Sequence, residues 1–241
     1  MDSPIGSARF TTTHWSVILE AARPEAPGSL DAFGRLYRDY WPPLYAYVRR
    51  RGYSHHEAED LNQGFFVSLI ERDRLRDLER GGGRFRSFLL TALQNFLANE
   101  WDRATAAKRG GGQAIVALDA VDADSGFLTD PTQAAPETGF EREWAFTVIE
   151  HAMRALASEL RAAGKETLYE HLRPHLQGDR NGRPYADIAA DLGMSEGAVK
   201  VGVHRLRQRY GELLRAEVAR TVGSEGEIAE ELRHLIAIVS A

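Results

Sequence analysis

The densest cluster of side chains that could perform chemistry lies between His55 and Asp60, where two histidines precede three acids. Side chains four positions apart share one face of a helix, so His55 with Glu59, or His56 with Asp60, could begin a metal site. A closed metal site needs about four ligands, and no third or fourth ligand converges on these pairs. The same residues suit the acidic first turn of a helix. We therefore predict no metal here.

Two further patterns resemble catalytic or nucleotide-binding motifs, and both fail on their spacing. His171 and His175 are four positions apart, but Pro174 lies between them and no glutamate follows His171, which excludes the zinc-protease pattern. The segment 164–167 lacks the earlier glycine of a phosphate-binding loop. The chain has no cysteine, hence no cysteine nucleophile and no disulfide. The sequence predicts a protein that is not an enzyme and needs no cofactor.

The clearest functional pattern is a pair of short helices joined by a tight turn. Pro184 opens the first helix, Gly193 ends it as a left-handed cap, and Ser195 caps the second. The second helix has a regularly spaced apolar face, formed by Val199, Val203, Leu206, Tyr210 and Leu213. Its opposite face is polar and basic, as in a helix that enters the DNA major groove. The alternative is a purely structural helix pair.

The candidate DNA contacts of this pair lie on the exposed face of the second helix. Residues near its start would reach base edges, whereas Arg207 and Arg209, further along, suit phosphates. The candidate contacts are Ser195, Gly197, Lys200, Val201, His204, Arg205, Arg207 and Gln208.

The charge of the chain is unevenly distributed along its 241 residues. The total is −5, with a net +3 in residues 30–110, −6 in 111–181 and +2 in 182–220. Neutralising phosphates supplies most non-specific affinity for DNA, so a chain this weakly basic would bind DNA poorly without a partner. No segment reaches the roughly 18 apolar residues of a membrane span, and no signal peptide is visible. We expect a cytoplasmic protein that does not bind membranes.

Helical spacing dominates the sequence and predicts an all-α fold. The first apolar stripe is interrupted by Pro42 and Pro43, so we expect one helix before these prolines and another after them. Ser54 and Glu57 form the capping-box pattern at the start of the next helix. A long amphipathic helix follows over about residues 84–108.

We divide the chain into two small helical domains, a linker and two terminal extensions. The linker is acidic and without periodicity, so we expect it to be flexible. The last extension contains an amphipathic helix that needs a cover, and it could dock on the second domain, act as an autoinhibitory element or bind a partner. The boundaries are 1–29 for the N-terminal extension, 30–110 for the first domain, 111–138 for the linker, 139–220 for the second domain and 221–241 for the C-terminal extension.

Motifs in both domains resemble those of extracytoplasmic-function sigma factors, a group of the sigma-70 family of bacterial RNA polymerase sigma factors. The second domain resembles region 4 of that family, which binds the −35 promoter element, through Asp187-Ile188-Ala189, Leu192-Gly193-Met194-Ser195, Gly197, Val199-Lys200, His204-Arg205 and Arg207. The first domain resembles region 2 through Ala58-Glu59-Asp60-Leu61-Asn62-Gln63 and Phe65-Phe66, and through Phe88-Leu89, Asn95, Asn99 and Arg103. Asn62, Gly64 and Phe88 depart from the residues that are commoner in the family.

The resemblance implies two partners, core RNA polymerase and promoter DNA. The residues implied to bind the clamp coiled coil of the polymerase are Glu59, Asp60, Leu61, Gln63 and Phe66. The residues implied to bind the −10 element are Arg84, Arg86, Asn95, Asn99 and Arg103. The acidic linker resembles segments that thread the RNA channel of the polymerase, although a solvated tether explains it equally well. No anti-sigma domain is visible, which leaves regulation to a separate anti-sigma factor, a kinase or the extensions.

Two other classes of function remain open from the sequence. One is a stand-alone helix-turn-helix regulator that binds duplex DNA as a dimer, and the other is a helical interaction protein with a degenerate DNA-binding module. Neither gives a role to the helix that contains Glu59, Asp60 and Gln63. That helix therefore discriminates between the hypotheses.

Overall fold

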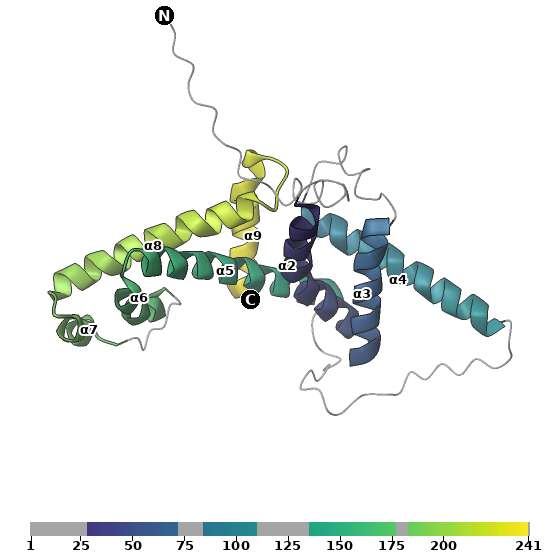
Figure 1. Cartoon of the computed structure of the whole chain (residues 1–241), viewed down its shortest axis with the longest axis horizontal. Helices are drawn as coiled ribbons and strands as arrows, with labels where there is room; N and C mark the ends of the chain where they lie inside the picture. The colour runs from purple at the N-terminus through teal and green to yellow at the C-terminus, as the bar shows by residue number, and fades with distance from the viewer. Residues whose placement is uncertain (1–27, 72–83, 110–134, 177–182, 241) are drawn as a thin grey trace, which may run out of the picture. The chain divides into compact units, whose positions relative to one another are not determined.

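The computed structural model of the chain describes residues 28–71, 84–109, 135–176 and 183–240, and within them it contains only helices, turns and short connections (Figure 1). The predicted all-α fold class is confirmed. Contacts divide the described residues into two compact units. The first extends to Ala145 and resumes at Arg220, and the second is Phe146–Ala219. The linker prediction falls largely on residues 111–134, which lie outside the described residues.

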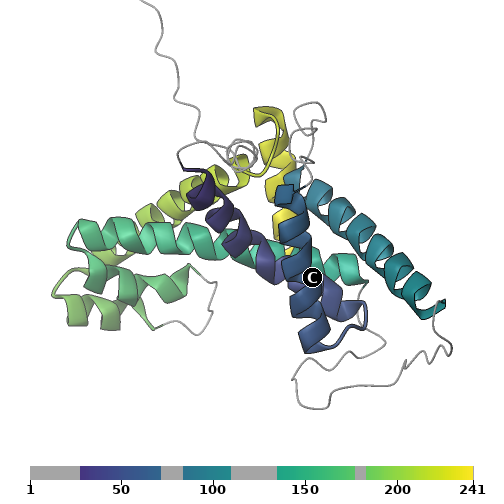
Figure 2. The same cartoon turned by 45° about the vertical axis from the view of Figure 1, so that its right-hand side comes forward.

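The first unit contains three long helices and the end of the chain. Its elements are α2 (Ser29–Arg50), α3 (His55–Glu71), α4 (Phe85–Arg109), the first turns of α5 (Pro136–Ala162), η3 (Glu225–Glu227) and α9 (Ile228–Ser240). The second unit contains the rest of α5, α6 (Glu166–Leu172), η2 (Arg173–His175), α7 (Tyr185–Leu192) and α8 (Glu196–Ala219). Helices α2 and α3 lie side by side in both views (Figures 1 and 2).

Helix α2 continues through Pro42 and Pro43, so the expected break between two helices is wrong. Prolines remove two N–H donors from the helix, a loss that ordinarily interrupts it. Here a buried apolar stripe runs without interruption across the prolines, and it consists of Leu36, Tyr40, Leu44 and Tyr47. The buried side-chain amide of Asn62 donates a hydrogen bond of 3.1 Å to the carbonyl of Trp41, next to the prolines. Burial of this stripe against the rest of the first unit thus outweighs the tendency of proline to break a helix.

The core of the first unit is rich in aromatic rings from α2, α3 and α4. Phe66 of α3 lies with its ring centroid 4.8 Å from that of Tyr37 and 6.1 Å from those of Phe33 and Trp41. Gly64, which departs from the family pattern, lies against α4, where an added Cβ would come within 3.3 Å of the ring of Phe96. The small residue therefore lets α3 approach the aromatic side chain of α4 closely.

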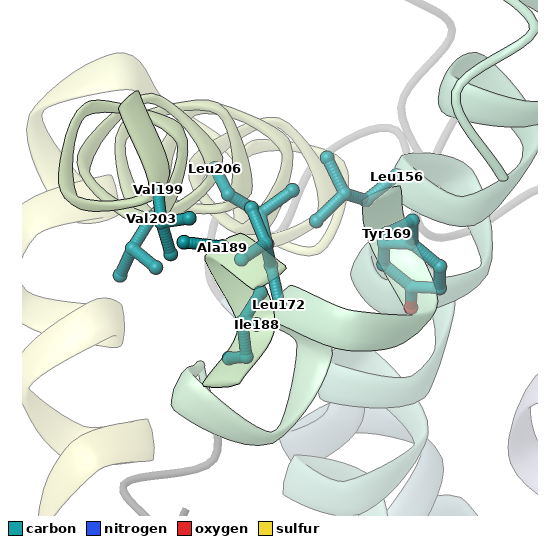
Figure 3. Packing of buried hydrophobic residues seen from close by; sticks show 8 residues of the cluster. All are labelled: Leu156, Tyr169, Leu172, Ile188, Ala189, Val199, Val203 and Leu206. Carbon is teal, nitrogen blue, oxygen red and sulfur yellow. The ribbon is translucent and has the colours of Figure 1, made fainter. Parts of the chain in front are cut away.

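The core of the second unit joins all four of its α-helices (Figure 3). Its side chains point toward one another from α5, α6, α7 and α8, and they are Leu156, Tyr169, Leu172, Ile188, Ala189, Val199, Val203 and Leu206. Gly202 of α8 faces α6 so closely that an added Cβ would lie 3.1 Å from Leu172. This core fixes the position of α8 on α7 and thereby determines which face of α8 remains exposed.

Candidate nucleic-acid interface

The start of α3 is fixed by a capping box. The backbone N–H of Ser54 donates to Glu57 Oε2 at 2.9 Å, and the N–H of Glu57 donates to Ser54 Oγ at 3.3 Å. These hydrogen bonds hold the pKa of the Glu57 carboxyl below its usual range, with the backbone bond from Ser54 as the largest cause. The predicted helix start is confirmed, and it sets the rotation of the residues that follow.

The exposed face of α3 carries three of the residues predicted to bind polymerase. Glu59, Asp60 and Gln63 are exposed, and we call them the α3 surface. Beneath them Leu61 is half-buried and Phe66 is buried in the aromatic core. Glu59 Oε1 lies 3.5 Å from His55 Nε2, whereas Asp60 and Gln63 have no hydrogen bond or ion pair within the described part of the chain. The α3 surface is thus a polar face that no other described element covers.

Val67 extends this face and was not identified from the sequence. It lies one helical turn after Gln63, and its side chain is exposed although it is β-branched and apolar. A single exposed apolar residue is common on protein surfaces, so Val67 does not by itself identify a contact surface, but it adds apolar area beside Gln63. Its spacing of four from Gln63 would have placed it on this face. It lies, however, within an apolar run whose other residues are typical of a buried core.

Helix α4 presents a polar stripe of three residues that were predicted to contact the −10 element. Asn95, Asn99 and Arg103 are spaced by four and are all exposed. The guanidinium of Arg103 donates to Glu100 Oε1 at 2.5 Å. Trp101 lies on the same helix with 60% of its surface exposed, and the sequence interpretation did not include it. A large aromatic residue left in water offers a flat surface for stacking.

The first residues of α4 differ from this stripe, because Arg86 is only 1% exposed. Its Nε donates to Glu141 Oε2 at 2.7 Å, its Nη1 is ion-paired with Glu231, and its guanidinium lies 4.4 Å from the ring centre of Trp144. Burial lowers the pKa of Arg86, and the Glu141 carboxylate opposes that shift. Carboxylates and a ring occupy the guanidinium of Arg86, so it is not accessible to DNA in this structure, and its contact with the −10 element stays a prediction.

Arg84 is partly accessible but also engaged by carboxylates. Its Nη2 donates to Glu230 Oε1 at 2.6 Å, and its Nε lies 2.9 Å from Glu231 Oε2. We call the group of Arg84, Arg86, Glu141, Glu230 and Glu231 the arginine–glutamate cluster. It brings together α4, α5 and α9, and it places both arginines predicted for the −10 element against acids from other segments.

The second unit contains the predicted helix-turn-helix geometry (Figure 3). Gly193 ends α7 in the left-handed conformation with φ 62°, and the N–H of Met194 donates a hydrogen bond of 3.0 Å to the carbonyl of Ala189. Ser195 Oγ accepts from the N–H of Ala198 at 3.2 Å, which caps α8. The buried face of α8 is the one expected, so the opposite face is available to a ligand.

All eight residues predicted as −35 contacts are exposed. Lys200 Nζ lies 2.9 Å from Glu196 Oε1 on the same helix, and His204 and Arg205 make no hydrogen bond or ion pair within the described part of the chain. Arg207 donates to the carbonyl of His175 at 2.9 Å. Arg209, suggested for phosphates, is instead bound by Glu159 through two hydrogen bonds of 2.8 and 2.7 Å and by Glu212 at 2.7 Å.

Among the described residues, no group of three or more histidine, cysteine or acidic side chains is arranged to hold a metal ion. The His55–Glu59 pair therefore gains no further ligand there. His55 Nδ1 instead lies 2.6 Å from the hydroxyl of Tyr45. Nor does any helix in these residues have the length and apolar character needed to cross a membrane.

Residues 36–107 match the Sigma-70 region 2 family. The matched span covers most of α2, all of α3 and nearly all of α4, and it includes the α3 surface and the polar stripe of α4. Comparisons with curated proteins and with solved structures found no match. The match supports a place for this chain in the sigma-70 family of RNA polymerase sigma factors, which are non-catalytic initiation factors. A region 2 domain points to polymerase binding and promoter recognition.

Proposed function

We propose that this protein is a sigma factor of the extracytoplasmic-function group, which binds core RNA polymerase and directs it to promoters. The observation that carries the proposal is the presence of two features in one chain. The first unit has a region 2 match with an uncovered α3 surface, and the second unit has a helix-turn-helix with an exposed basic face. A stand-alone DNA-binding regulator would need only the second feature.

In this proposal the α3 surface binds the clamp coiled coil of the polymerase. Asp60 and Gln63 are exposed and make no ion pair or hydrogen bond within the described residues, so both can meet a basic partner without breaking a native contact. Val67 supplies apolar area on the same face. Interfaces commonly combine such an apolar centre with a polar rim.

In the same proposal α4 and α8 bind promoter DNA at two sites. The stripe of Asn95, Asn99 and Arg103 offers amide and guanidinium groups that can hold unpaired bases of the −10 element. On α8, Lys200 and Arg205 are placed to reach base edges or phosphates of the −35 element in the major groove. The weak overall basicity of the chain agrees with a protein that binds DNA together with polymerase.

A pull-down with purified bacterial core RNA polymerase tests the proposal. We expect the full chain to be retained, and we expect Asp60→Arg combined with Gln63→Ala to abolish retention, because a cation would then face the basic coiled coil. Asp31→Arg is the matched control, since Asp31 is an exposed acid on α2 and its replacement makes the same change of charge. Retention of the double variant at the wild-type level would exclude the α3 surface as the contact. Failure of the wild type to bind, together with tight binding to duplex DNA alone, would favour the stand-alone regulator.

A further inference from the structure

Helix α9 docks on the first unit through a face that combines apolar side chains with one carboxylate. Ile228, Glu231 and Leu235 are buried and lie on one face of the helix, whereas Ile236, beside this face, and Val239, one turn after Leu235, are exposed. Glu231 is 0% exposed. A helix of this length is marginal in water by itself, so its docking maintains it.

The docking site of α9 is the start of α4. Glu231 is ion-paired with both Arg84 and Arg86, and Glu230 accepts a hydrogen bond from Arg84 at 2.6 Å. The segment before α9 adds a backbone contact, since the carbonyl of Thr221 accepts from the N–H of Phe85 at 3.3 Å. Helix α9 also contacts α5, since His234 Nε2 lies 2.9 Å from Glu141 Oε2.

The chemistry of these contacts is that of nucleic-acid binding with carboxylates in place of phosphates. A guanidinium presents the same fork of N–H donors to a carboxylate and to a phosphate, so one group excludes the other. The rim of the site is accessible: the side chain of Arg84 is 30% exposed and that of Glu230 is 61% exposed. Ion pairs in such positions are weak and exchange readily.

We propose that α9 covers the amino-terminal end of α4 within the same chain. Helix α9 must move away before Arg84 can bind nucleic acid. The inference rests on the proposed function, because it concerns regulation of the predicted −10 site. In the free chain the acids of α9 hold the site closed. Nucleic acid and α9 compete for it, so the apparent affinity for nucleic acid is reduced by the fraction of molecules in which α9 is docked.

The test weakens the docking without changing any charge. Leu235→Ala removes apolar contact from the buried face of α9, and Ile236→Ala removes a similar side chain from the exposed face of the same helix. Both are made in the full chain and studied by hydrogen exchange and by fluorescence anisotropy with a labelled single-stranded oligonucleotide of mixed sequence. Ile228→Ala is the second docking variant, to be used if Leu235→Ala does not fold.

We expect Leu235→Ala to speed amide exchange in residues 228–240 and to bind the oligonucleotide about a hundredfold more tightly than wild type, because truncating a buried leucine shifts most molecules from the closed to the open form. Helices α2, α3 and α4 should keep their protection, and Ile236→Ala should match wild type in both measurements. Faster exchange in α9 with unchanged or weaker binding would overturn the proposal. Loss of protection across α2, α3 and α4 would also overturn it, because α9 would then be a permanent part of the first unit.

These measurements do not involve polymerase, so they separate the two proposals. If the wild type fails to bind core polymerase, the sigma-factor assignment fails. The exchange and oligonucleotide results would then still decide whether α9 covers a nucleic-acid site.

Discussion

Helices α4 and α8 both begin with residues that the sequence assigns to DNA binding, but the two helices present their cations in opposite ways. On α8, Lys200 and Arg205 are exposed, and among the described residues Lys200 is paired only with Glu196 of its own helix. On α4, Arg86 is buried and Arg84 is bound by carboxylates of α9. A basic residue near the start of a helix is therefore not sufficient to identify a DNA contact. The acids that other segments bring to it decide its role.

The largest effect that tests this comparison is expected from Glu231→Gln. It removes a fully buried carboxylate from two arginines, and breaking a buried ion pair from one side commonly costs about 3–5 kcal/mol. We expect a loss of about 3 kcal/mol in the free energy of unfolding of the first unit, measured by chemical denaturation. Glu230→Gln, at the exposed rim, should cost less than about 1 kcal/mol. Equal losses of stability in the two variants would show that burial does not strengthen the ion pairs of Glu231.

The next effect concerns the two faces of α8. Leu206→Ala removes a buried side chain from the core in Figure 3 and should cost about 2 kcal/mol of unfolding free energy in the second unit, at the low end for a buried leucine. Val201→Ala, on the exposed face of the same helix, should change it by less than about 0.5 kcal/mol. Thermal unfolding followed by circular dichroism measures both. A large destabilisation by Val201→Ala would contradict the assignment of this face to a ligand.

A third prediction distinguishes exposed cations from paired ones on α8. Arg205→Ala should cost about 1–3 kcal/mol of binding free energy, as for loss of a base contact. Arg209→Ala should cost less, because Glu159 and Glu212 already bind that guanidinium and hold its pKa above its usual range. Fluorescence anisotropy measures the DNA affinity of both variants. The probe is a duplex DNA that has first been selected for binding to the complex of this chain with polymerase. A greater loss from Arg209→Ala would mean that its ion pairs open on DNA.

The smallest effect is the pH dependence of the α3 cap. The hydrogen bond from the backbone N–H of Ser54 makes the pKa of the Glu57 carboxyl lower in the folded state than in the unfolded chain. Its contribution to stability is therefore present above the unfolded pKa and is lost as the pH falls through the folded pKa. The contribution is about 0.5 kcal/mol, at the low end for an exposed cap. The difference in urea midpoint between wild type and Glu57→Ala should therefore shrink between pH 7 and pH 3. A difference that stays constant over this range would contradict the prediction.

What the sequence predicts well is local. The capping box of Ser54 and Glu57 and the left-handed Gly193 depend on residues a few positions apart, and both were predicted and found. The exposed faces of α3 and α8 follow from helical spacing in the same way. Such features need no knowledge of the rest of the chain.

What the sequence does not predict depends on distant partners. Arg86 reads as a polar residue on the outer face of α4, but its partners Glu141 and Glu231 come from α5 and α9. Pro42 and Pro43 read as a helix break, yet a stripe buried against other helices carries α2 through them. Whether α9 would dock, and where, was likewise open from its amphipathic pattern alone.

Competition for core RNA polymerase is the most direct test of the α3 surface as a polymerase contact. The labelled full chain is bound to purified core polymerase, and an unlabelled sigma factor known to bind the same enzyme is titrated in. We expect saturable binding of the wild type and its complete displacement, with no binding by the Asp60→Arg, Gln63→Ala variant. Binding that the competing sigma factor does not displace, or no binding by the wild type, would contradict the assignment of the α3 surface as a sigma-type polymerase contact.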